Sequence, residues 1–269
     1  MDEQHELFPN LFEAALLIAL LVVIELVAWA AVVDAGMFAQ ISASDVSAFI
    51  VVIGNGVLFV GLMAYKRIGY RSLFHSARHS VGATLTVVTL PILMMIPGLV
   101  MVAGVLSMFV YLLFPISSEE SSMFAEMMAP GIVPFLSTCV LAPVLEEMLF
   151  RGVILRSFLL QYSRTKAILA SSLIFGIAHM NVYQLATAFA IGIVAGWLYE
   201  RCRSLWPCIL LHAAYNAFVT FSYHSADATD GTLTLYTGAA FAGVIIGALL
   251  LLRILGSAAP TRDRSPTNQ

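Results

Sequence analysis

Residues 145–151 read LEEMLFR and place three charged side chains, Glu146, Glu147 and Arg151, at the end of an apolar run that begins near Gly131. A charged side chain inside a bilayer span costs roughly 2.5–3.5 kcal/mol on insertion scales, so such residues usually serve a function. At helical spacing Glu147 and Arg151 are i,i+4 partners in the favourable order, acid before base. Glu146 points about 100° away and has no intrahelical cation. The stretch predicts one paired and one unpaired carboxylate closing a membrane span; an ordinary juxtamembrane charge cluster is the alternative.

The composition indicates a polytopic membrane protein. Of 269 residues, 60% are hydrophobic and 11% are charged, whereas about 25% of the residues in an ordinary soluble domain are charged. No basic stripe typical of nucleic-acid binding occurs, so we expect no nucleic-acid partner. Cys139, Cys202 and Cys208 lack the spacing of zinc ligands or of a disulfide framework and are interpreted as reduced packing residues. The acidic N-terminus and the long first apolar run argue against a cleavable signal peptide.

Apolar runs along the chain predict an all-α fold of about eight transmembrane helices. Seven runs are long enough to cross roughly 30 Å of hydrocarbon, and a shorter one lies at 167–180. The seven runs are 11–33, 46–65, 82–114, 132–150, 184–200, 205–223 and 234–255. The segment 116–130 predicts a short interfacial helix. We expect residues 1–256 to form a single transmembrane domain and residues 257–269 to be a disordered cytoplasmic tail.

The basic residues predict the orientation of these spans. All 13 Lys and Arg fall in four stretches that eight crossings place on one side of the membrane. The four stretches are 66–78, 151–166, 201–203 and 253–264. The positive-inside rule therefore places both termini in the cytoplasm, with the loops 34–45 and 224–232 outside. We expect an integral protein of a bacterial inner membrane.

Few polar residues lie within the predicted spans. His179 lies in the fifth span, and His212 and Asn216 lie one turn apart in the seventh. With a rise of about 1.5 Å per residue, Glu146, His212 and His179 are roughly 8, 14 and 20 Å from the nearest basic residues that flank their spans. Tilted helices could close this spread and would favour a cavity in the cytoplasmic half of the membrane. Glu25 lies deep in the first span, and the sequence offers it no partner.

These side chains suit the hydrolysis of an amide bond. A carboxylate shielded from bulk water is a better base toward water, and a neutral imidazole can orient the same water. A second imidazole and a neighbouring carboxamide can donate hydrogen bonds to a developing oxyanion. No Ser or Cys is paired with a histidine at a recognisable spacing, which disfavours covalent catalysis. Zinc hydrolysis is the chemical alternative, because Glu and two His are also zinc ligands, although neither H-E-x-x-H nor its inversion occurs.

Three motifs in order along the chain resemble those of a known family, the CAAX protease and bacteriocin-processing family. This family is also called the Abi family and includes the Ras-converting prenyl-protein endopeptidase. The motifs lie within residues 141–216 and read Glu146-Glu147-x-x-x-Arg151, Phe175-x-x-x-His179 and His212-x-x-x-Asn216.

The resemblance implies an eight-helix intramembrane glutamate endopeptidase, for which we expect no cofactor and no metal. In such an enzyme Glu146 would activate water together with His179. His212 and Asn216 would form the oxyanion hole. The other three motif residues would support these groups.

The resemblance does not fix the substrate. Prenylated CAAX proteins, bacteriocin or pheromone leaders and anti-sigma factors all occur as substrates in such a family. We therefore expect a peptide or membrane-associated protein as partner, lipidated ones included, in addition to the lipid bilayer. A non-catalytic immunity or chaperone-like protein could use the same cavity to bind a peptide. A proton-coupled transporter is a further alternative, which the lack of an internal repeat disfavours.

Overall fold

The computed structural model describes residues 7–36, 43–224 and 233–256, which are almost entirely helical. Its long helices are α2 (Leu11–Asp34), α3 (Ala43–Lys66), α5 (Val81–Leu113), α10 (Arg164–Ala178), α11 (Val182–Cys202), α12 (Trp206–His224) and α13 (Leu233–Gly256). The shorter helices α4 (Tyr70–Phe74) and α6 (Ser118–Met127) connect them. One β-bridge, between His75 and Ser204, is the only strand-like pairing in the described ranges.

The run that carries the charged motif forms one continuous helix, Ile132–Gln161, of 30 residues. Its segments are α7 (Ile132–Leu136), the π-helical η2 (Ser137–Leu141), α8 (Ala142–Glu147), the π-helical η3 (Met148–Leu155) and α9 (Arg156–Gln161). π-Helical turns inside α-helices occur frequently at functional sites. We refer to residues 132–161 as the motif helix.

The helix that carries the charged residues therefore does not end at about residue 150, and where the membrane span ends within it stays a prediction. The motif helix continues to Gln161, and all residues of η3, Arg151 included, are buried. The charged turn can lie inside the protein because Glu147 balances the charge of Arg151 there. Because Arg151 is buried in the protein, it does not support the predicted orientation of the stretch 151–166.

Six helices of the described residues are long and apolar enough to cross a membrane. They are α2, α3, α5, the motif helix, α11 and α13. This finding confirms the all-α polytopic membrane fold. The two other expected spans correspond to α10 and α12, which have 15 and 19 residues. Because neither is among the six, the number of eight crossings stays a prediction.

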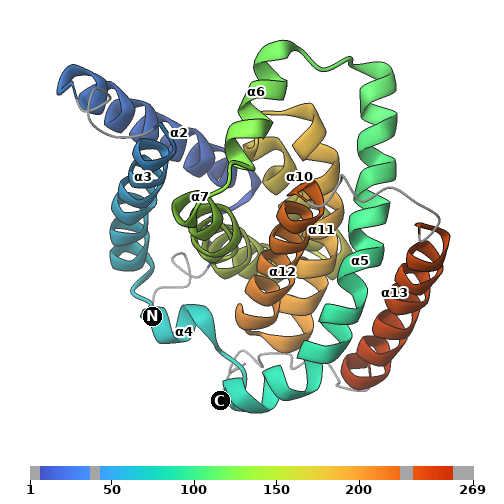
Figure 1. The fold of residues 1–269 in the computed structure, drawn as a ribbon. Coiled ribbons are helices and arrows are strands. Elements are labelled where there is room, and N and C mark those ends of the chain that lie inside the picture. The colour runs from blue at the N-terminus through green and yellow to red at the C-terminus, as the bar shows by residue number, and fades with distance from the viewer. Residues whose placement is uncertain (1–6, 37–42, 225–232, 257–269) are drawn as a thin grey trace, which may run out of the picture.

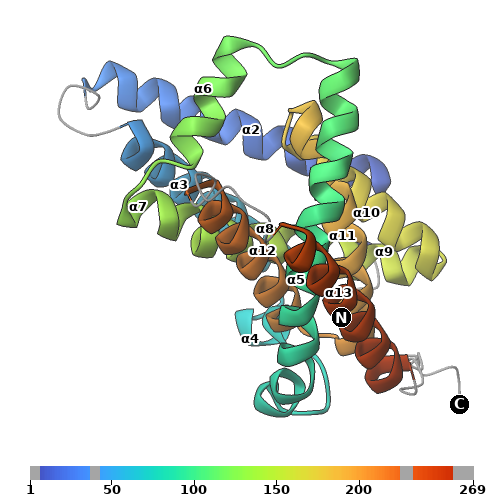
Figure 2. The ribbon, with the colours of Figure 1, turned by 45° about the vertical axis from the view of Figure 1, so that its right-hand side comes forward.

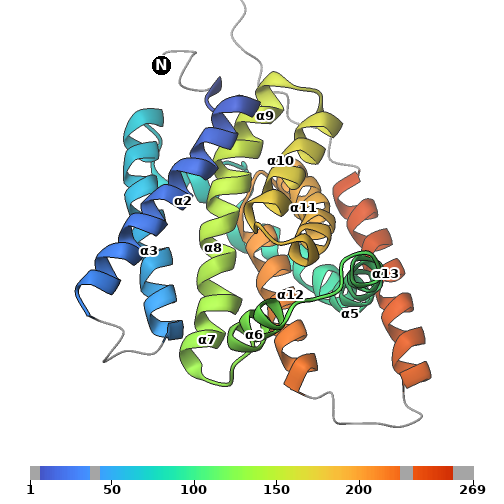
Figure 3. The ribbon, with the colours of Figure 1, turned by 90° about the horizontal axis from the view of Figure 1, so that it is seen from above.

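The other long helices form three groups, two of which flank the motif helix (Figures 1, 2 and 3). Helices α2 and α3 lie side by side on one side of the motif helix, and α10, α11 and α12 lie on the other. Helices α5 and α13 pack against each other beyond this second group, with α5 in contact with α11 and α12. The motif helix therefore presents its charged turn to residues from several helices.

Small residues bring α10 and α11 close together. A Cβ atom added at Gly192 would lie 2.9 Å from Ser172 Cβ, and one at Gly196 would lie 3.1 Å from Ile168 Cγ2. Small residues allow such close approach of helix backbones in membranes. Gly192 and Gly196 therefore form a small-residue pair at which α11 packs closely against α10.

Two further sequence predictions concern the polar segments. The expected interfacial segment 116–130 contains α6, which begins with a capping box formed by Ser117 and Glu120. The expected tail 257–269 lies outside the described residues, as do 37–42 and 225–232 of the two predicted outer loops. The domain boundary at residue 256 stays a prediction.

Candidate active site

The ion pair predicted within LEEMLFR is present and fully buried. Arg151 Nη1 donates a hydrogen bond to Glu147 Oε1 at 2.9 Å, and the two side chains are 1% and 0% exposed. Arg151 Nη2 donates to the main-chain oxygen of Gly192 at 3.2 Å. The guanidinium also lies 4.5 Å from the centre of the Phe175 ring. Arg151 thus joins the motif helix to both α10 and α11.

His212 of α12 lies between the two adjacent glutamates. Its Nδ1 is 2.9 Å from Glu147 Oε1, and its Nε2 is 3.8 Å from Glu146 Oε2. An ionised carboxylate only accepts hydrogen bonds, so Nδ1 donates to Glu147 and Nε2 faces Glu146. This hydrogen bond fixes both the orientation and the tautomer of the ring. Nε2 of the neutral ring presents a lone pair, and it becomes a donor when the ring is protonated.

Glu146 is the more accessible of the two glutamates. Its side chain is 29% exposed, whereas that of Glu147 is completely buried. Within the described residues, the Oε2 atom of Glu146 is itself buried and has no hydrogen-bond partner, so the exposed part of the Glu146 side chain lies elsewhere. Hydrogen bonds of catalytic groups are often long before substrate binds. Glu146 is therefore the carboxylate in this cluster that a water molecule or a substrate can reach.

Phe175 of α10 packs against both imidazole rings. Its ring centre lies 5.0 Å from that of His179 and 5.7 Å from that of His212, in edge-to-face geometry. His179 is the C-cap residue of α10, and its Nδ1 is 2.9 Å from the Phe175 main-chain oxygen. Because a carbonyl oxygen only accepts, Nδ1 of His179 donates and Nε2 keeps a lone pair. Both imidazoles are thus held by a hydrogen bond at Nδ1, which leaves Nε2 of each ring available to interact with water or substrate.

In the described part of the chain, neither His179 nor Asn216 makes a hydrogen bond or ion pair with Glu146 or Glu147. The contact of His179 with the cluster runs through Phe175. Asn216 Nδ2 donates to the main-chain oxygen of Thr138 at 2.8 Å. Thr138 lies in η2, so Asn216 is fixed to the motif helix about two turns before Glu146. The other five motif residues form one network of direct contacts: Glu146, Glu147, Arg151, Phe175 and His212.

Two hydrogen-bond acceptors of the candidate site were missed by the sequence analysis. The main-chain oxygens of Gly192 and Thr138 accept hydrogen bonds from Arg151 and Asn216. Every residue has a peptide carbonyl, so no residue type signals this role. The sequence indicates only that Gly192 is a small residue, which allows α10 and α11 to pack closely at this position.

The continuous motif helix also changes the estimated depth of the site. With a rise of about 1.5 Å per residue, Glu146 lies roughly 22 Å from Gln161, and His179 lies roughly 22 Å from Arg164. The sequence had placed these two side chains at depths that differed by more than two helical turns. Counted from the ends of the helices in the structure, the two depths agree.

The zinc alternative needs three ligands around one ion. The described residues contain no group of three or more His, Cys, Asp or Glu side chains placed to hold a metal. The ligand set considered from the sequence, Glu146 with His179 and His212, is thus not assembled in this arrangement.

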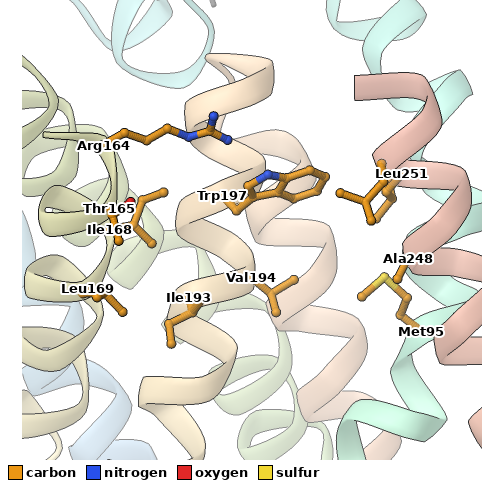
Figure 4. A pocket seen from close by; sticks show the side chains of 11 residues that line it. Met95, Arg164, Thr165, Ile168, Leu169, Ile193, Val194, Trp197, Ala248 and Leu251 are labelled. Atoms are coloured by element: carbon orange, nitrogen blue, oxygen red, sulfur yellow. The ribbon is translucent and has the colours of Figure 1, made fainter. Parts of the chain in front are cut away.

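A cavity of about 540 Å³ lies away from the motif residues, among α5, α10, α11 and α13 (Figure 4). Apolar side chains such as Trp197 and Leu251 line most of it, and Arg164 is its one charged lining residue. Arg164 Nη2 lies 2.9 Å from Glu200 Oε2, which Arg201 Nε also approaches to 3.4 Å. This cavity contains no acid or base that could activate water, and the cluster around Glu146 is the better candidate site.

Comparison with known proteins supports this choice. Residues 128–218 match a family model described as Rce1-like, type II CAAX prenyl endopeptidase. The resemblance to this family is confirmed. The Rce1-like region contains every motif residue named above and extends from just before the motif helix into α12.

Two curated proteins are similar to a larger part of the chain. The "Putative membrane peptidase YdiL" of Bacillus subtilis is 29% identical over 170 residues, which are 60% of this chain and 66% of that protein. The "Uncharacterized 24.3 kDa protein" of Escherichia coli is 33% identical over 128 residues, which are 44% of this chain and 59% of that protein. The chain thus covers just under two thirds of the first relative and less of the second. No solved structure gives a significant match.

Proposed function

We propose that this chain is an intramembrane endopeptidase in which Glu146 is the general base. The observation that carries the proposal is the pair of adjacent glutamates with different surroundings. Glu147 is buried and bound to Arg151 and His212, whereas Glu146 is accessible and faces His212 Nε2. Carboxylates whose environments differ in this way take different roles in catalysis. The Rce1-like match and the membrane peptidase relative support hydrolysis of a peptide bond.

In the proposed reaction Glu146 takes a proton from a water molecule while the water oxygen attacks the carbonyl carbon of the scissile peptide bond. His179 Nε2, which keeps its lone pair, orients the same water. The tetrahedral intermediate collapses as the C–N bond breaks, and Glu146 returns the proton to the leaving nitrogen. No covalent bond to the enzyme forms, and the products are a carboxylic acid and an amine.

The negative oxygen of the intermediate is stabilised by His212 and Asn216. Nε2 of His212 donates to the oxyanion when the ring is protonated, and Glu147 at Nδ1 stabilises that protonated ring. Arg151 balances the charge of Glu147 in either state of the ring. An amide nitrogen carries two protons, so Asn216 Nδ2 can bind Thr138 and still donate to the oxyanion.

The proposed substrate is a peptide or a membrane-associated protein, lipidated proteins included. This class follows from the Rce1-like match and from a site that several membrane-spanning helices surround. The proposed mechanism needs no cofactor. We further propose a bacterial inner membrane location with both termini in the cytoplasm, supported by the one-sided placement of the basic residues other than Arg151.

The proposal is tested by comparing membrane peptides from cells that produce wild-type protein or Glu146→Gln. Gln keeps the size of Glu but cannot accept the proton. We expect at least one peptide to accumulate uncleaved with Glu146→Gln. Glu119→Gln, on the exposed surface of α6, is the control and should match wild type. Identical peptide patterns, with a peptide still bound by Glu146→Gln, would instead indicate the non-catalytic peptide-binding function.

A further inference from the structure

A second cavity, of about 360 Å³, lies between α2 and α3 and contains Glu25. Its volume is within the roughly 300–1,000 Å³ that is typical of ligand pockets. Apolar side chains such as Leu26, Trp29 and Ile50 form most of its walls, and Glu25 is its one charged lining residue. An ionisable side chain inside a membrane span usually has a functional partner. No hydrogen bond or ion pair to Glu25 occurs in the described ranges of the chain.

This cavity adjoins the candidate active site. Met180, which lines it, directly follows His179, so the two Cα atoms are about 3.8 Å apart. The Glu25 carboxylate is close enough to Glu146 for their charges to interact. Counted at about 1.5 Å per residue, Glu25 lies roughly 21 Å from the start of α2, close to the depth of Glu146 and His179 in their helices. The cavity thus adjoins the candidate active site at Met180 and at Glu25.

We propose that this cavity binds a lysine or arginine side chain of the substrate peptide beside the scissile bond, with Glu25 as the partner of its cationic group. The inference rests on the proposed function. Lys and Arg combine a long apolar stem with a charged tip, which matches apolar walls that carry a single carboxylate. An extended peptide advances about 3.3–3.6 Å per residue, so a residue held beside Met180 lies within a few positions of the bond that Glu146 attacks.

The position of Glu25 depends on Gly54 of α3. A Cβ atom at Gly54 would lie 2.6 Å from Glu25 Cγ and 3.3 Å from its Oε1. Gly54→Ala therefore displaces the Glu25 side chain without removing its charge. A Cβ atom at Gly56, on the same helix, meets nothing within 4 Å, so Gly56→Ala is the matched control.

The test measures cleavage specificity with full-length protein in proteoliposomes. The probe is a mixture of cellular peptides cut after acidic residues, which keeps Lys and Arg inside the peptides. Mass spectrometry identifies the new ends, and Glu146→Gln provides the background. Wild type should give cleavage sites enriched in Lys or Arg within three residues of the cut bond. One cleaved peptide is then synthesised with Lys, norleucine or Glu at that position.

The Glu25 variants give the decisive comparison. Glu25→Gln should lower the preference for Lys over norleucine, as a ratio of kcat/KM, at least about tenfold, because it removes one partner of a charge pair. Glu25→Lys should favour the peptide with Glu. Gly54→Ala should lower the preference for Lys, and Gly56→Ala should leave it unchanged.

Two negative results are distinguishable. A wild-type protein that cleaves no more peptides than Glu146→Gln overturns the proposed function, and this inference with it. A wild type that cleaves without enrichment of Lys or Arg, or Glu25→Gln that keeps the preference for Lys, overturns only the role of Glu25.

Discussion

Replacing Arg151 by alanine should destabilise the fold as well as abolish activity. The substitution removes the 2.9 Å ion pair with Glu147, the hydrogen bond to Gly192 and the contact with the Phe175 ring. Removing one partner of a buried ion pair typically costs about 3–5 kcal/mol, because the other charge stays buried. The three contacts share one guanidinium and are not additive, and His212 still donates to Glu147. We therefore expect a loss of about 3–5 kcal/mol in the free energy of unfolding.

The assay is the yield of monodisperse protein in mild detergent together with its apparent Tm. At roughly 2–4 °C per kcal/mol for a chain of this size, the Tm should fall by roughly 6–20 °C. Arg151→Lys keeps the charge but loses the planar fork that reaches Glu147 and Gly192 together, so it should recover part of the loss. The double variant Glu147→Gln, Arg151→Met leaves no unpaired buried charge and should be more stable than Arg151→Ala.

A different result would refute the reasoning. If Arg151→Ala had the yield and Tm of wild type and lacked only activity, the ion pair would not stabilise the fold. Arg151 would then act at the reacting centre. Equal Tm values for Arg151→Ala and the double variant would show that the isolated charge of Glu147 is not the source of the destabilisation.

Three further predictions concern the oxyanion hole, helix packing and topology. Asn216→Ala should cost about 3–4 kcal/mol of transition-state stabilisation, seen as a lower kcat with little change in KM. Gly176→Ala should lower the Tm, because its Cβ would lie 2.8 Å from the main-chain oxygen of Leu185 and overpacking costs about 1–3 kcal/mol; Gly61→Ala, which meets nothing within 4 Å, should not. A cysteine introduced within 66–80 should not react with an impermeant thiol reagent added outside the cell. Labelling at this position would contradict the predicted orientation of the spans.

The spans and the ion pair could be predicted from the sequence because both depend on local spacing. Long apolar runs predicted the helices, and the i,i+4 spacing of Glu147 and Arg151 predicted their contact. The continuation of the motif helix to Gln161 could not be predicted in this way. Local rules treat a cluster of charges as a boundary, whereas Phe175 and Gly192, from two other helices, accommodate Arg151 inside the protein.

The candidate site was only partly predictable for the same reason. The motif residues were identified from their order and spacing, but the contact of His212 with Glu147 joins positions 65 residues apart and depends on how α12 packs against the motif helix. For Glu25, the sequence showed the residue but not its surroundings. Its charge was conspicuous in the sequence, but its cavity is formed with α3 and Met180 and has no local signature.

The most direct test of the central claim is the rate at which purified protein hydrolyses a cleaved peptide in the presence of a metal chelator, for wild type and for Glu146→Gln. If Glu146 is the general base, wild type keeps its activity with the chelator, and Glu146→Gln, with the same Tm, loses at least about 10²–10⁴-fold. Activity of Glu146→Gln close to that of wild type, or wild-type activity that the chelator abolishes and zinc restores, would contradict the account.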